Sequence, residues 1–359
     1  MRHSHLSNPK TLFLDTHDVA RLLGVIGVPD ALTQLVARLR ADYLRWPQFE
    51  KAARVASYSS QGTIELMPIS DGTQYTYKCV NGHPGNGLRG LPTVMAMGAL
   101  LDCDTGMIRM ISELTLTTAM RTAATSALAA QALARPDSRT MALIGNGAQS
   151  DFQALAFYTL LGIREIRLYD LDRSASQRLQ HNLAASGLAD LRVQICDSVR
   201  QAVQGADIVT TVTAFQGVAQ VLSADLLEPG MHINAVGGDC PGKTELDPAI
   251  LPHTTVFVEF PPQTRHEGEI QNQAADFPIT ELWRVLADQQ PGRTDAAQIT
   301  LFDSVGFALE DYSALQFLHA QATRHSIGRW VEVTPDQEDP RDLFGWLQAQ
   351  NHPADALAG

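Results

Sequence analysis

The sequence predicts an α/β protein with a mainly antiparallel α+β region followed by a doubly wound parallel sheet. Two patterns of apolar residues indicate this. Between residues 52 and 112 apolar and polar residues alternate with a period of two and no helix intervenes, which is typical of an antiparallel sheet. From residue 140 onward short apolar strands alternate with helical stretches in units of about 30 residues, which indicates βαβ crossovers.

The composition is that of a globular protein long enough for two or three domains. Of its 359 residues 45% are hydrophobic and 18% are charged, which excludes a disordered or fibrous chain. The 27 Lys and Arg against 39 Asp and Glu give a formal net charge of −12. Because no long basic run occurs, nucleic acid and anionic membranes are not expected as partners. A small anionic ligand needs only two or three placed cations and stays compatible.

The cysteines and the N-terminal segment predict a cytoplasmic protein without a metal site. The cysteines are far apart and form no CxxC pair, which indicates a reducing compartment and neither disulfides nor a thiolate zinc site. The first ten residues lack the apolar core of a secretory signal, and no run of 18 apolar residues predicts a membrane span. His3 and His5 suggest metal ligands only weakly, because a frayed terminus explains them better. The four cysteines are Cys79, Cys103, Cys196 and Cys240.

The first region, residues 1–136, is expected to bind the substrate and to form a dimer interface. A strand at 11–14 precedes a helix at 30–43, whose apolar residues share one face. An alanine-rich helix follows the sheet at 115–135 and ends at Pro136. Between them Gly, Pro, Asn and Asp separate five expected strands: 55–58, 63–67, 75–80, 93–97 and 107–111.

The second region, residues 137–315, is expected to hold the parallel sheet. The tail after residue 311 is expected to be helical with no strand partner of its own, so that 316–359 packs back on the first region. The expected strands are 140–144, 165–169, 191–195, 207–211 and 231–236, and the expected helices are 149–161, 174–185 and 198–203.

A glycine motif, Gly145-Asn-Gly-Ala-Gln-Ser150, directly follows the first parallel strand and opens a helix. In dinucleotide-binding Rossmann folds the first glycine allows the tight turn, and the second lets the backbone approach the pyrophosphate at the helix N-terminus. Ser150 stands where Gly or Ala is usual. Because a strand and a helix flank the motif, it predicts a nucleotide site rather than an ordinary turn.

A carboxylate at the end of the second strand favours NAD over NADP. Asp170 lies 25 residues after Gly145, where it accepts hydrogen bonds from both ribose hydroxyls and repels a 2′-phosphate. The neighbouring Arg173 weakens that preference. Helix capping is the alternative role, but Asp172 or Ser174 suits it better. The segment 211–213 ends the fourth strand, where doubly wound folds contact their ligands.

Four polar residues are candidates for chemistry. Asp239 follows two glycines at the end of an apolar strand and would be a general base if partly desolvated; a turn aspartate is equally compatible. Arg121 lies among threonines and alanines, with room to reach a ligand carboxylate; a surface arginine is the alternative. Lys78 and Glu65 lie inside alternating strands, Glu65 on the face of Met67, and solvated strand positions would explain both.

Seven segments together resemble the ornithine cyclodeaminase/μ-crystallin family over about residues 12–340. Two of them, Ile64-Glu-Leu-Met-Pro68 and the block 234–246, look most like the bacterial ornithine cyclodeaminases. The other segments are Ala53–Val55, Tyr77–Pro84, Arg121–Ser126, Leu143–Ser150 and Phe302–Tyr312.

The resemblance implies a homodimer whose N-terminal sheets join across the interface, with a Rossmann domain on each subunit. It also implies conversion of L-ornithine to L-proline and ammonia. NAD would remove a hydride from Cα and return it to the cyclic imine, with no net redox change.

The resemblance also implies roles for individual residues. Asp239 and Lys78 would be catalytic: Asp239 would bind the δ-amino group and act as acid and base in ring closure, and Lys78 would polarise the α-imine. Glu65 would favour a cationic substrate, and Lys78 would share the substrate carboxylate with two arginines. The substrate-binding residues would be Arg54, Glu65, Met67, Lys78, Arg121 and Asp239. The cofactor-binding residues would be Thr93, Arg121, Gly145, Asn146, Gly147, Ala148, Gln149, Asp170, Thr211, Val212, Thr213, Val236, Gly237, Gly238, Lys243, Ser304 and Val305.

Other activities of the same family remain open. A lysine cyclodeaminase would differ by one methylene in its substrate, worth only about 1–3 kcal/mol in a pocket. A ketimine or pyrroline-2-carboxylate reductase or an alanine dehydrogenase would carry out a net redox step. Asp239 and Glu65 together favour a diamine substrate, since an imine reductase needs neither. A non-catalytic binding protein of the μ-crystallin type is disfavoured, because Asp239, Lys78 and Arg121 are all present.

Overall fold

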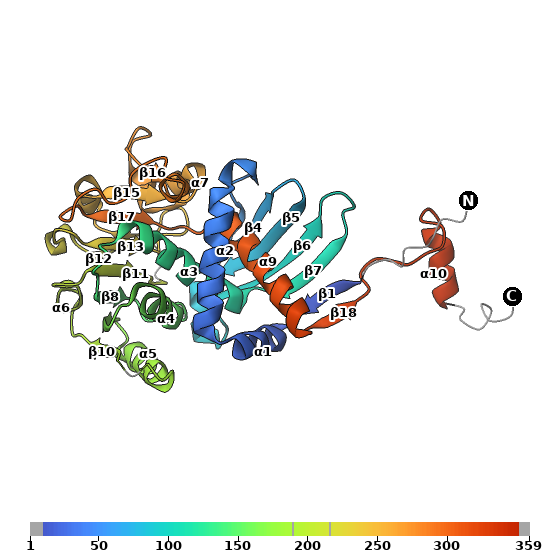
Figure 1. The fold of residues 1–359 in the computed structure, drawn as a ribbon, viewed down its shortest axis with the longest axis horizontal. Coiled ribbons are helices and arrows are strands. Elements are labelled where there is room, and N and C mark those ends of the chain that lie inside the picture. Colours follow the sequence, from blue (N-terminus) through green and yellow to red (C-terminus); the bar gives the residue numbers. More distant parts are fainter. Residues whose placement is uncertain (1–9, 189, 215–216, 352–359) are drawn as a thin grey trace.

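The computed structural model describes residues 10–188, 190–214 and 217–351 and contains two eight-stranded sheets with helices between and around them (Figure 1). His3 and His5 lie outside the described residues. Three helices, α2 (Val28–Leu44), α3 (Thr115–Leu133) and α9 (Ala308–His325), stand between the sheets. The predicted α/β architecture is confirmed.

The first sheet is mainly antiparallel, as predicted. Its strand order is β18-β1-β7-β6-β5-β4-β2, and β3 pairs with β4 off this path. Consecutive strands from β3 to β7 are antiparallel, whereas β1 is parallel to β7. The strands are β1 (Thr11–Leu14), β2 (Glu50–Lys51), β3 (Val55–Ser59), β4 (Gly62–Ser70), β5 (Gln74–Gly82), β6 (Val94–Asp102), β7 (Ile108–Glu113) and β18 (Arg329–Val331).

The strand β18 corrects one expectation. The tail was expected to have no strand partner, but after α9 the chain forms β18, which pairs antiparallel with β1 so that Thr11 lies opposite Val331. Three residues are too few to carry a visible alternation of apolar and polar positions. The helix α9 packs against α2 and against β4, β5 and β6, and the expected boundary at residue 315 falls inside it.

The second sheet is entirely parallel, with the order β10-β9-β8-β11-β13-β17-β15-β16. The chain order reverses between β8 and β11, the place where such sheets bind ligands. Its strands are β8 (Thr140–Ile144), β9 (Glu165–Tyr169), β10 (Arg192–Ile195), β11 (Ile208–Thr211), β13 (His232–Ala235), β15 (Thr255–Val258), β16 (Thr280–Glu281) and β17 (Thr300–Asp303), with β12 (Val218–Leu222) and β14 (Thr244–Leu246) forming a separate pair.

The five strands predicted for this sheet are present, and β12, β14, β15, β16 and β17 were not predicted. The predicted strands alternate with helices, whereas each unpredicted strand is flanked by a 3-10 turn or by a helix of five to seven residues, so no regular alternation marks it. The remaining helices are α1 (Thr16–Ile26), α4 (Ser150–Leu161), α5 (Arg173–Ala185), α6 (Val199–Val203), α7 (Pro261–Glu267), α8 (Leu282–Leu286) and α10 (Leu343–Asn351), with 3-10 turns η1 (Trp46–Gln48), η2 (Pro84–Arg89), η3 (Ala224–Leu226), η4 (Pro248–His253) and η5 (Glu269–Asn272).

The helix α3 couples the two sheets. It contacts β6 of the first sheet and β13 and β17 of the second. Its alanines, among them Ala123, Ala127 and Ala130, are buried and bring the helix backbone close to both layers. The arrangement places residues of the antiparallel sheet beside the carboxyl edge of the parallel sheet.

The helix α10 stands off the body at the end of an extended arm (Figure 1), and none of its residues is buried. Among the described residues no single helix combines the length and apolarity needed to cross a membrane. The pair α1–α2, bent by 97°, meets those two criteria only when both helices are taken together.

Candidate active site

The glycine loop after β8 has the geometry of a nucleotide-binding turn. Gly145 has φ +92°, and a Cβ atom there would lie 2.8 Å from the carbonyl oxygen of Val212. Glycine is therefore required both for the backbone conformation and for the close approach of the two loops. Around Gly147, by contrast, a Cβ would meet nothing within 4 Å, so this position faces open space where a pyrophosphate would lie.

The start of α4 is free to receive an anion. Its N-cap residue, Gln149, makes no side-chain hydrogen bond to the first turn, which leaves first-turn N–H groups available. Within the described chain the Gln149 Oε1 and Thr211 Oγ1 atoms are buried without a hydrogen-bond partner. Ser150, the departure from the usual motif, is buried and donates to the Gly145 carbonyl oxygen at 2.8 Å. The serine thus closes the loop rather than disrupting it.

Asp170 lies at the end of β9, beside the glycine loop. It accepts hydrogen bonds from the backbone N–H groups of Asn146 (2.6 Å) and Asp172 (2.8 Å). Asp172 caps α5 by accepting from the Ser174 N–H at 2.9 Å, as predicted. Arg173 pairs with Asp197 at 2.6 Å instead of Asp170. The loop, the helix start and the carboxylate together fit an adenine dinucleotide with a free ribose 2′-hydroxyl.

Two alanine variants distinguish the structural role of Gly145 from the cofactor-binding role of Gly147. Gly145→Ala is expected to lower the melting temperature by several degrees, because a side chain at this φ costs roughly 1–3 kcal/mol and the Cβ would press on Val212. Gly147→Ala is expected to leave the melting temperature unchanged and to weaken NAD binding at least tenfold. Thermal melts and a NAD titration of both variants measure this. Equal melting temperatures for the two variants would contradict the assignment.

Three buried cations lie on the other side of the site. Lys78 Nζ lies 2.9 Å from Asp311 Oδ1, and Arg121 Nε lies 3.1 Å from the same oxygen. Arg121 Nη1 lies 2.6 Å from Glu310 Oε2. Burial lowers the pKa of Lys78 to about 8, with Arg121 adding to this effect and Asp311 opposing it. At neutral pH Lys78 is thus mostly protonated.

The third cation, Arg54, joins the two halves of the molecule. Its Nη1 donates to Glu65 at 2.8 Å, and its Nε lies 3.1 Å from Glu267 Oε2. Its Nη2 donates to the carbonyl oxygens of Val305 (2.6 Å) and Gly306 (2.7 Å), in the loop after β17. The side chains of Arg54, Glu65 and Glu267 are at most 10% exposed.

The period-two pattern placed the strand residues correctly. Met67 lies opposite Lys78 in the β4–β5 pairing, and Glu65 lies two residues before Met67 on the same buried face. Lys78 is 1% exposed. The alternative of solvated strand positions is therefore wrong for Lys78 and Glu65, and the alternative of a surface arginine is wrong for Arg121, which is 6% exposed.

Asp239, expected to be a general base if partly desolvated, is half withdrawn from solvent. Its side chain is 51% exposed and pairs with Lys243 Nζ at 2.9 Å. The next residue, Cys240, lines a cleft of about 350 Å³ between the β3–β4 hairpin and the loop after β13, together with Tyr58, Thr63 and Lys243 among others. Asp239 is thus an accessible carboxylate at the mouth of the site rather than a buried one.

Gly237 and Gly238 make room for carboxylates. A Cβ on Gly237 would overlap Glu245, and one on Gly238 would lie 2.7 Å from Glu269 Oε1. Glu245 also accepts from the Thr213 backbone N–H at 2.7 Å. Val236, Gly237 and Gly238 follow β13 at the carboxyl edge of the sheet, as expected for the cofactor set, but the glycines are explained here by internal packing.

Two predicted cofactor residues contact other groups. Thr93 precedes β6, where its carbonyl oxygen accepts from the His83 N–H at 2.9 Å, and its described contacts do not join it to the glycine loop. Ser304 Oγ donates to Glu259 Oε1 at 2.7 Å. Among the described residues no group of three or more His, Cys, Asp or Glu side chains could hold a metal ion.

Sequence reasoning missed five buried polar residues around the site: three acidic partners of the cations and two residues that bond to nearby loops. Glu310 and Asp311 open α9 directly after a glycine loop, and acidic residues in a first turn are a recognisable signal. Glu267 and Gln263 lie four residues apart on α7 and so share a face. Nothing local indicated Glu259. The five residues become significant only through contacts with distant parts of the chain.

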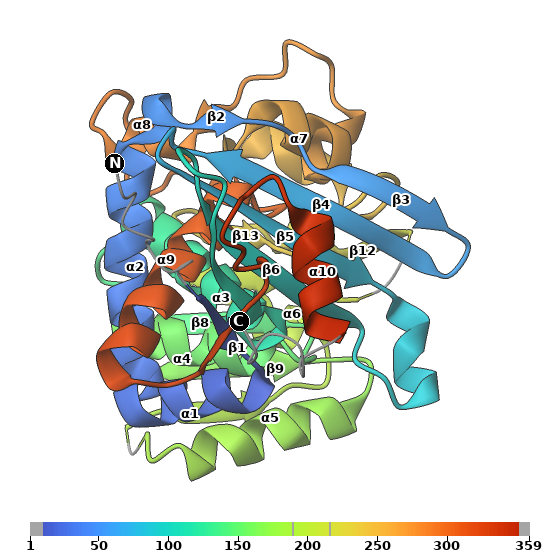
Figure 2. The same ribbon diagram turned by 90° about the vertical axis from the view of Figure 1, so that its right-hand side faces the viewer.

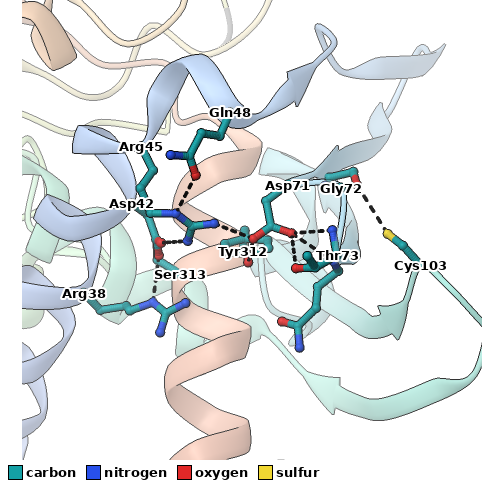
Figure 3. Close-up of polar contacts among 12 residues, drawn as sticks. Arg38, Asp42, Arg45, Gln48, Asp71, Gly72, Thr73, Cys103, Tyr312 and Ser313 are labelled. Carbon is teal, nitrogen blue, oxygen red and sulfur yellow. Dashed lines mark hydrogen bonds and ion pairs between the residues drawn. The ribbon is translucent and has the colours of Figure 1, made fainter.

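A polar network holds α9 against α2 and the β4–β5 turn (Figure 3). Tyr312 donates to Asp71 at 2.7 Å, and Ser313 donates to Asp42 at 2.9 Å. Arg45 bridges the same two aspartates, at 3.0 Å from Asp42 and 2.6 Å from Asp71. The network fixes the start of α9, so that the two acidic residues preceding Tyr312 face the cations.

Comparisons with known proteins agree with this geometry. A model of the ornithine cyclodeaminase/mu-crystallin family matches residues 17–326. The ornithine cyclodeaminase of Agrobacterium fabrum is 52% identical over 335 residues, which cover 93% of this chain and 94% of that protein. A lysine cyclodeaminase, studied for its recognition of L-lysine, L-ornithine and L-2,4-diaminobutyric acid, superposes with a TM-score of 0.88 at 31% identity, covering 93% of this chain and 99% of that one. An archaeal alanine dehydrogenase dimer with bound NAD superposes with a TM-score of 0.81 at 30% identity, covering 90% and 100%. The chain belongs to the ornithine cyclodeaminase/mu-crystallin family.

Proposed function

We propose that the protein is an ornithine cyclodeaminase, which converts L-ornithine to L-proline and ammonia with NAD as a recycled cofactor. One observation carries this proposal. Three buried cations, Arg54, Lys78 and Arg121, lie with two carboxylates, Glu65 and the accessible Asp239, at the carboxyl edge of a nucleotide-binding sheet. Such a site offers separate partners for the carboxylate and the ammonium groups of a diamino acid. The 52% identity to an ornithine cyclodeaminase supports the same substrate.

The substrate carboxylate would bind Arg121 and Lys78. Lys78 uses one of its three N–H groups for Asp311, and Arg121 uses its Nε–H for Asp311 and one N–H of Nη1 for Glu310. The guanidinium and the ammonium therefore keep donors for a further carboxylate. Arg54 is held by Glu65, Glu267 and two backbone carbonyl oxygens, so it would support the site mainly through its charge.

The distal amine would bind near Asp239. When bound, NAD supplies a hydride acceptor for Cα and afterwards the donor that reduces the ring imine. Asp239 would take a proton from the δ-ammonium, so that the δ-nitrogen can attack Cα. Lys243 lies 2.9 Å from the Asp239 carboxylate and so holds it at this position. Glu65 would add negative charge that favours a diamine over a monoamine.

The test is incubation of the purified protein with L-ornithine and a sub-stoichiometric amount of NAD⁺. We expect equal amounts of proline and ammonia, exceeding the NAD⁺ supplied, with no lasting absorbance of NADH. Accumulation of NADH in step with product would instead indicate a dehydrogenase. Turnover of L-lysine but not L-ornithine would indicate a lysine cyclodeaminase. The 31% identity to a lysine cyclodeaminase of known structure is the reason to test this alternative.

We also propose that two copies of the chain associate through the outer face of the first sheet, which faces the viewer in Figure 2. Cross-strand neighbours form an apolar row through Val55, Leu66, Cys79 and Met97. Val55 is 65% exposed, and Leu66 and Met97 are 40% and 42% exposed. An apolar row of this kind on a sheet face is typical of an interface. The similarity to an archaeal alanine dehydrogenase that is a dimer supports association in pairs.

Leu66→Asp is expected to convert a dimer into monomers, because it places a charge in the middle of the apolar row. Light scattering after size exclusion should give a mass near that of one chain for the variant and about twice that mass for the unmodified protein. Val25→Asp, a change at an exposed position of α1, is the control and should stay dimeric. A dimeric Leu66→Asp variant would place the interface elsewhere.

A cytoplasmic setting stays a prediction. The four cysteines are free thiols in the structure, which supports a reducing compartment. The position of Asp170 at the glycine loop supports the predicted preference for NAD over NADP.

A further inference from the structure

Glu267 enters the site from a part of the chain that no motif singled out. Its helix, α7, also carries Gln263, which accepts from the Arg54 backbone N–H at 3.2 Å and donates to the Gly306 carbonyl oxygen at 2.7 Å. One turn later the Glu267 carboxylate lies 3.1 Å from Arg54 Nε. The helix thus delivers a carboxylate to the inner side of the site, next to Arg54 and Glu65.

Among the described buried carboxylates at the site, Glu267 is set apart by how few hydrogen bonds it accepts. Glu245 and Asp311 also have one buried oxygen without a partner, but the other oxygen of each accepts hydrogen bonds, from Thr213 and from Lys78 and Arg121. Glu259 accepts from Ser304, Glu269 accepts two backbone N–H groups, and Asp303 accepts two more. The oxygens of these three carboxylates therefore accept hydrogen bonds that stabilise neighbouring loops. Glu267 is 2% exposed, yet its Oε2 receives no hydrogen bond from any residue in the described ranges, and the Arg54 contact is an ion pair without hydrogen-bond geometry. A buried carboxylate left unsatisfied in this way is costly unless a ligand completes it.

The pKa of the Glu267 carboxyl lies close to neutral pH. Burial raises the pKa of Glu267 to about 7; Arg54 opposes this shift, and Glu65 and Asp239 add to it. The ionisable groups that face it come from four segments: Arg54 before β3, Tyr58 on β3, Glu65 on β4, and Asp239 and Cys240 after β13. A carboxyl group with this pKa can both accept and return a proton at neutral pH.

Cyclodeamination moves protons at two nitrogens, and Asp239 at the mouth of the site serves only the δ-nitrogen. The α-ammonium must lose a proton before its nitrogen can form a double bond to Cα. The departing nitrogen must regain a proton before it leaves as ammonia. The proposed function therefore requires a second acid–base group on the inner side of the site.

We propose that Glu267 is that second group, the general base for the α-ammonium and the general acid for the departing ammonia; this rests on the proposed function. The Glu267 carboxylate takes one proton from the α-ammonium, and the freed electron pair forms the C=N bond as the Cα hydride passes to NAD. After the δ-nitrogen has bonded to Cα, it loses a second proton to Asp239, which exchanges protons with solvent, and Glu267 returns its own proton to the α-nitrogen. The Cα–N bond to the α-nitrogen then breaks and its electron pair leaves with ammonia, while the lone pair of the δ-nitrogen forms the C=N bond of the ring and the Glu267 carboxylate is regenerated.

Two assays of Glu267→Gln test the assignment. Glutamine keeps the size and polarity of the side chain but cannot exchange the proton. Proline formation from L-ornithine is expected to fall by about 10²–10⁴-fold. Reduction of Δ1-pyrroline-2-carboxylate by NADH is expected to stay within about threefold of the unmodified protein, because that half-reaction has neither an α-ammonium nor a leaving ammonia. The second assay also shows that the variant is folded.

The pH profile provides an independent readout. For the unmodified protein kcat/KM for ornithine should fall as the pH drops below about 7, because protonated Glu267 cannot accept the α-proton. Glu267→Gln should lose this limb. Glu65→Gln is the matched comparison, because Glu65 also pairs with Arg54: it should raise KM for ornithine but keep the acid limb of the pH profile.

Three results would overturn the proposal. Equal losses in both Glu267→Gln assays would mean that Glu267 only positions Arg54. Ornithine turnover near that of the unmodified protein would exclude any acid–base role. An unmodified protein that reduces the cyclic imine but does not convert ornithine would refute the proposed function first, before any variant is made.

Discussion

Asp239→Asn is expected to lower kcat for proline formation by about 10²–10⁴-fold, the usual contribution of a general acid or base, while NAD affinity stays within about twofold. Asparagine matches aspartate in shape, and its amide oxygen still accepts from Lys243, so the loop after β13 should keep its conformation. What is lost is the ability to take a proton from the δ-ammonium. The half-exposed position of the side chain makes an effect on stability small.

The measurement is steady-state proline formation together with a NAD titration of the same preparation. Asp276→Asn, at another exposed aspartate in the segment after η5, is the matched control and should behave like the unmodified protein. If Asp239→Asn retained near-normal turnover, the proton transfer at the δ-nitrogen would belong to another group, and Glu65 would be the next candidate.

Local patterns predicted the residues whose roles depend on local geometry. The glycine motif was recognisable because a strand, a turn and a helix follow each other within a few residues, and Gly145 indeed needs a positive φ. The period of two along the strands put Glu65 and Met67 on one face, but it left open whether that face, or the face of Lys78, is buried. The fold class followed from local patterns as well, since periodicity changes where the antiparallel sheet gives way to the parallel one.

Contacts between distant residues could not be predicted from one sequence. Lys78 and Asp311 are 233 positions apart, and Arg121 and Asp311 are 190 apart. Each residue alone is compatible with a solvated surface. The period of two shows neither that Lys78 is buried nor which carboxylate neutralises it, and Glu267 was missed because its contacts too lie far away in the sequence. For Asp239 the sequence left a partly desolvated base and a turn aspartate equally open, and the fold leaves that side chain half exposed.

Arg121→Lys is expected to lower kcat/KM for ornithine by about 10²–10⁴-fold. The guanidinium holds Glu310 with Nη1 and Asp311 with Nε, and its remaining donors face the proposed carboxylate site. A lysine ammonium is a single point of charge and cannot serve all three carboxylates. Each charge-assisted hydrogen bond lost is worth about 1.5–3 kcal/mol, and two such losses correspond to this range, since about 1.4 kcal/mol is a factor of ten.

The choice of lysine keeps the test interpretable. Arg121→Met would leave Glu310 and Asp311 short of a buried positive charge, at a cost of about 3–5 kcal/mol in the free energy of unfolding, and loss of activity would then mean loss of the fold. Arg121→Lys retains the charge, and Arg38→Lys, at the partly exposed ion pair with Asp42, is the control that should leave kcat/KM unchanged.

Because the cyclic imine carries the same carboxylate as ornithine, Arg121→Lys should also weaken Δ1-pyrroline-2-carboxylate reduction, unlike Glu267→Gln. Kinetics with both substrates therefore distinguish binding of the carboxylate from proton transfer at the α-nitrogen. If Arg121→Lys impaired ornithine turnover but spared reduction of the cyclic imine, Arg121 would not be the carboxylate ligand.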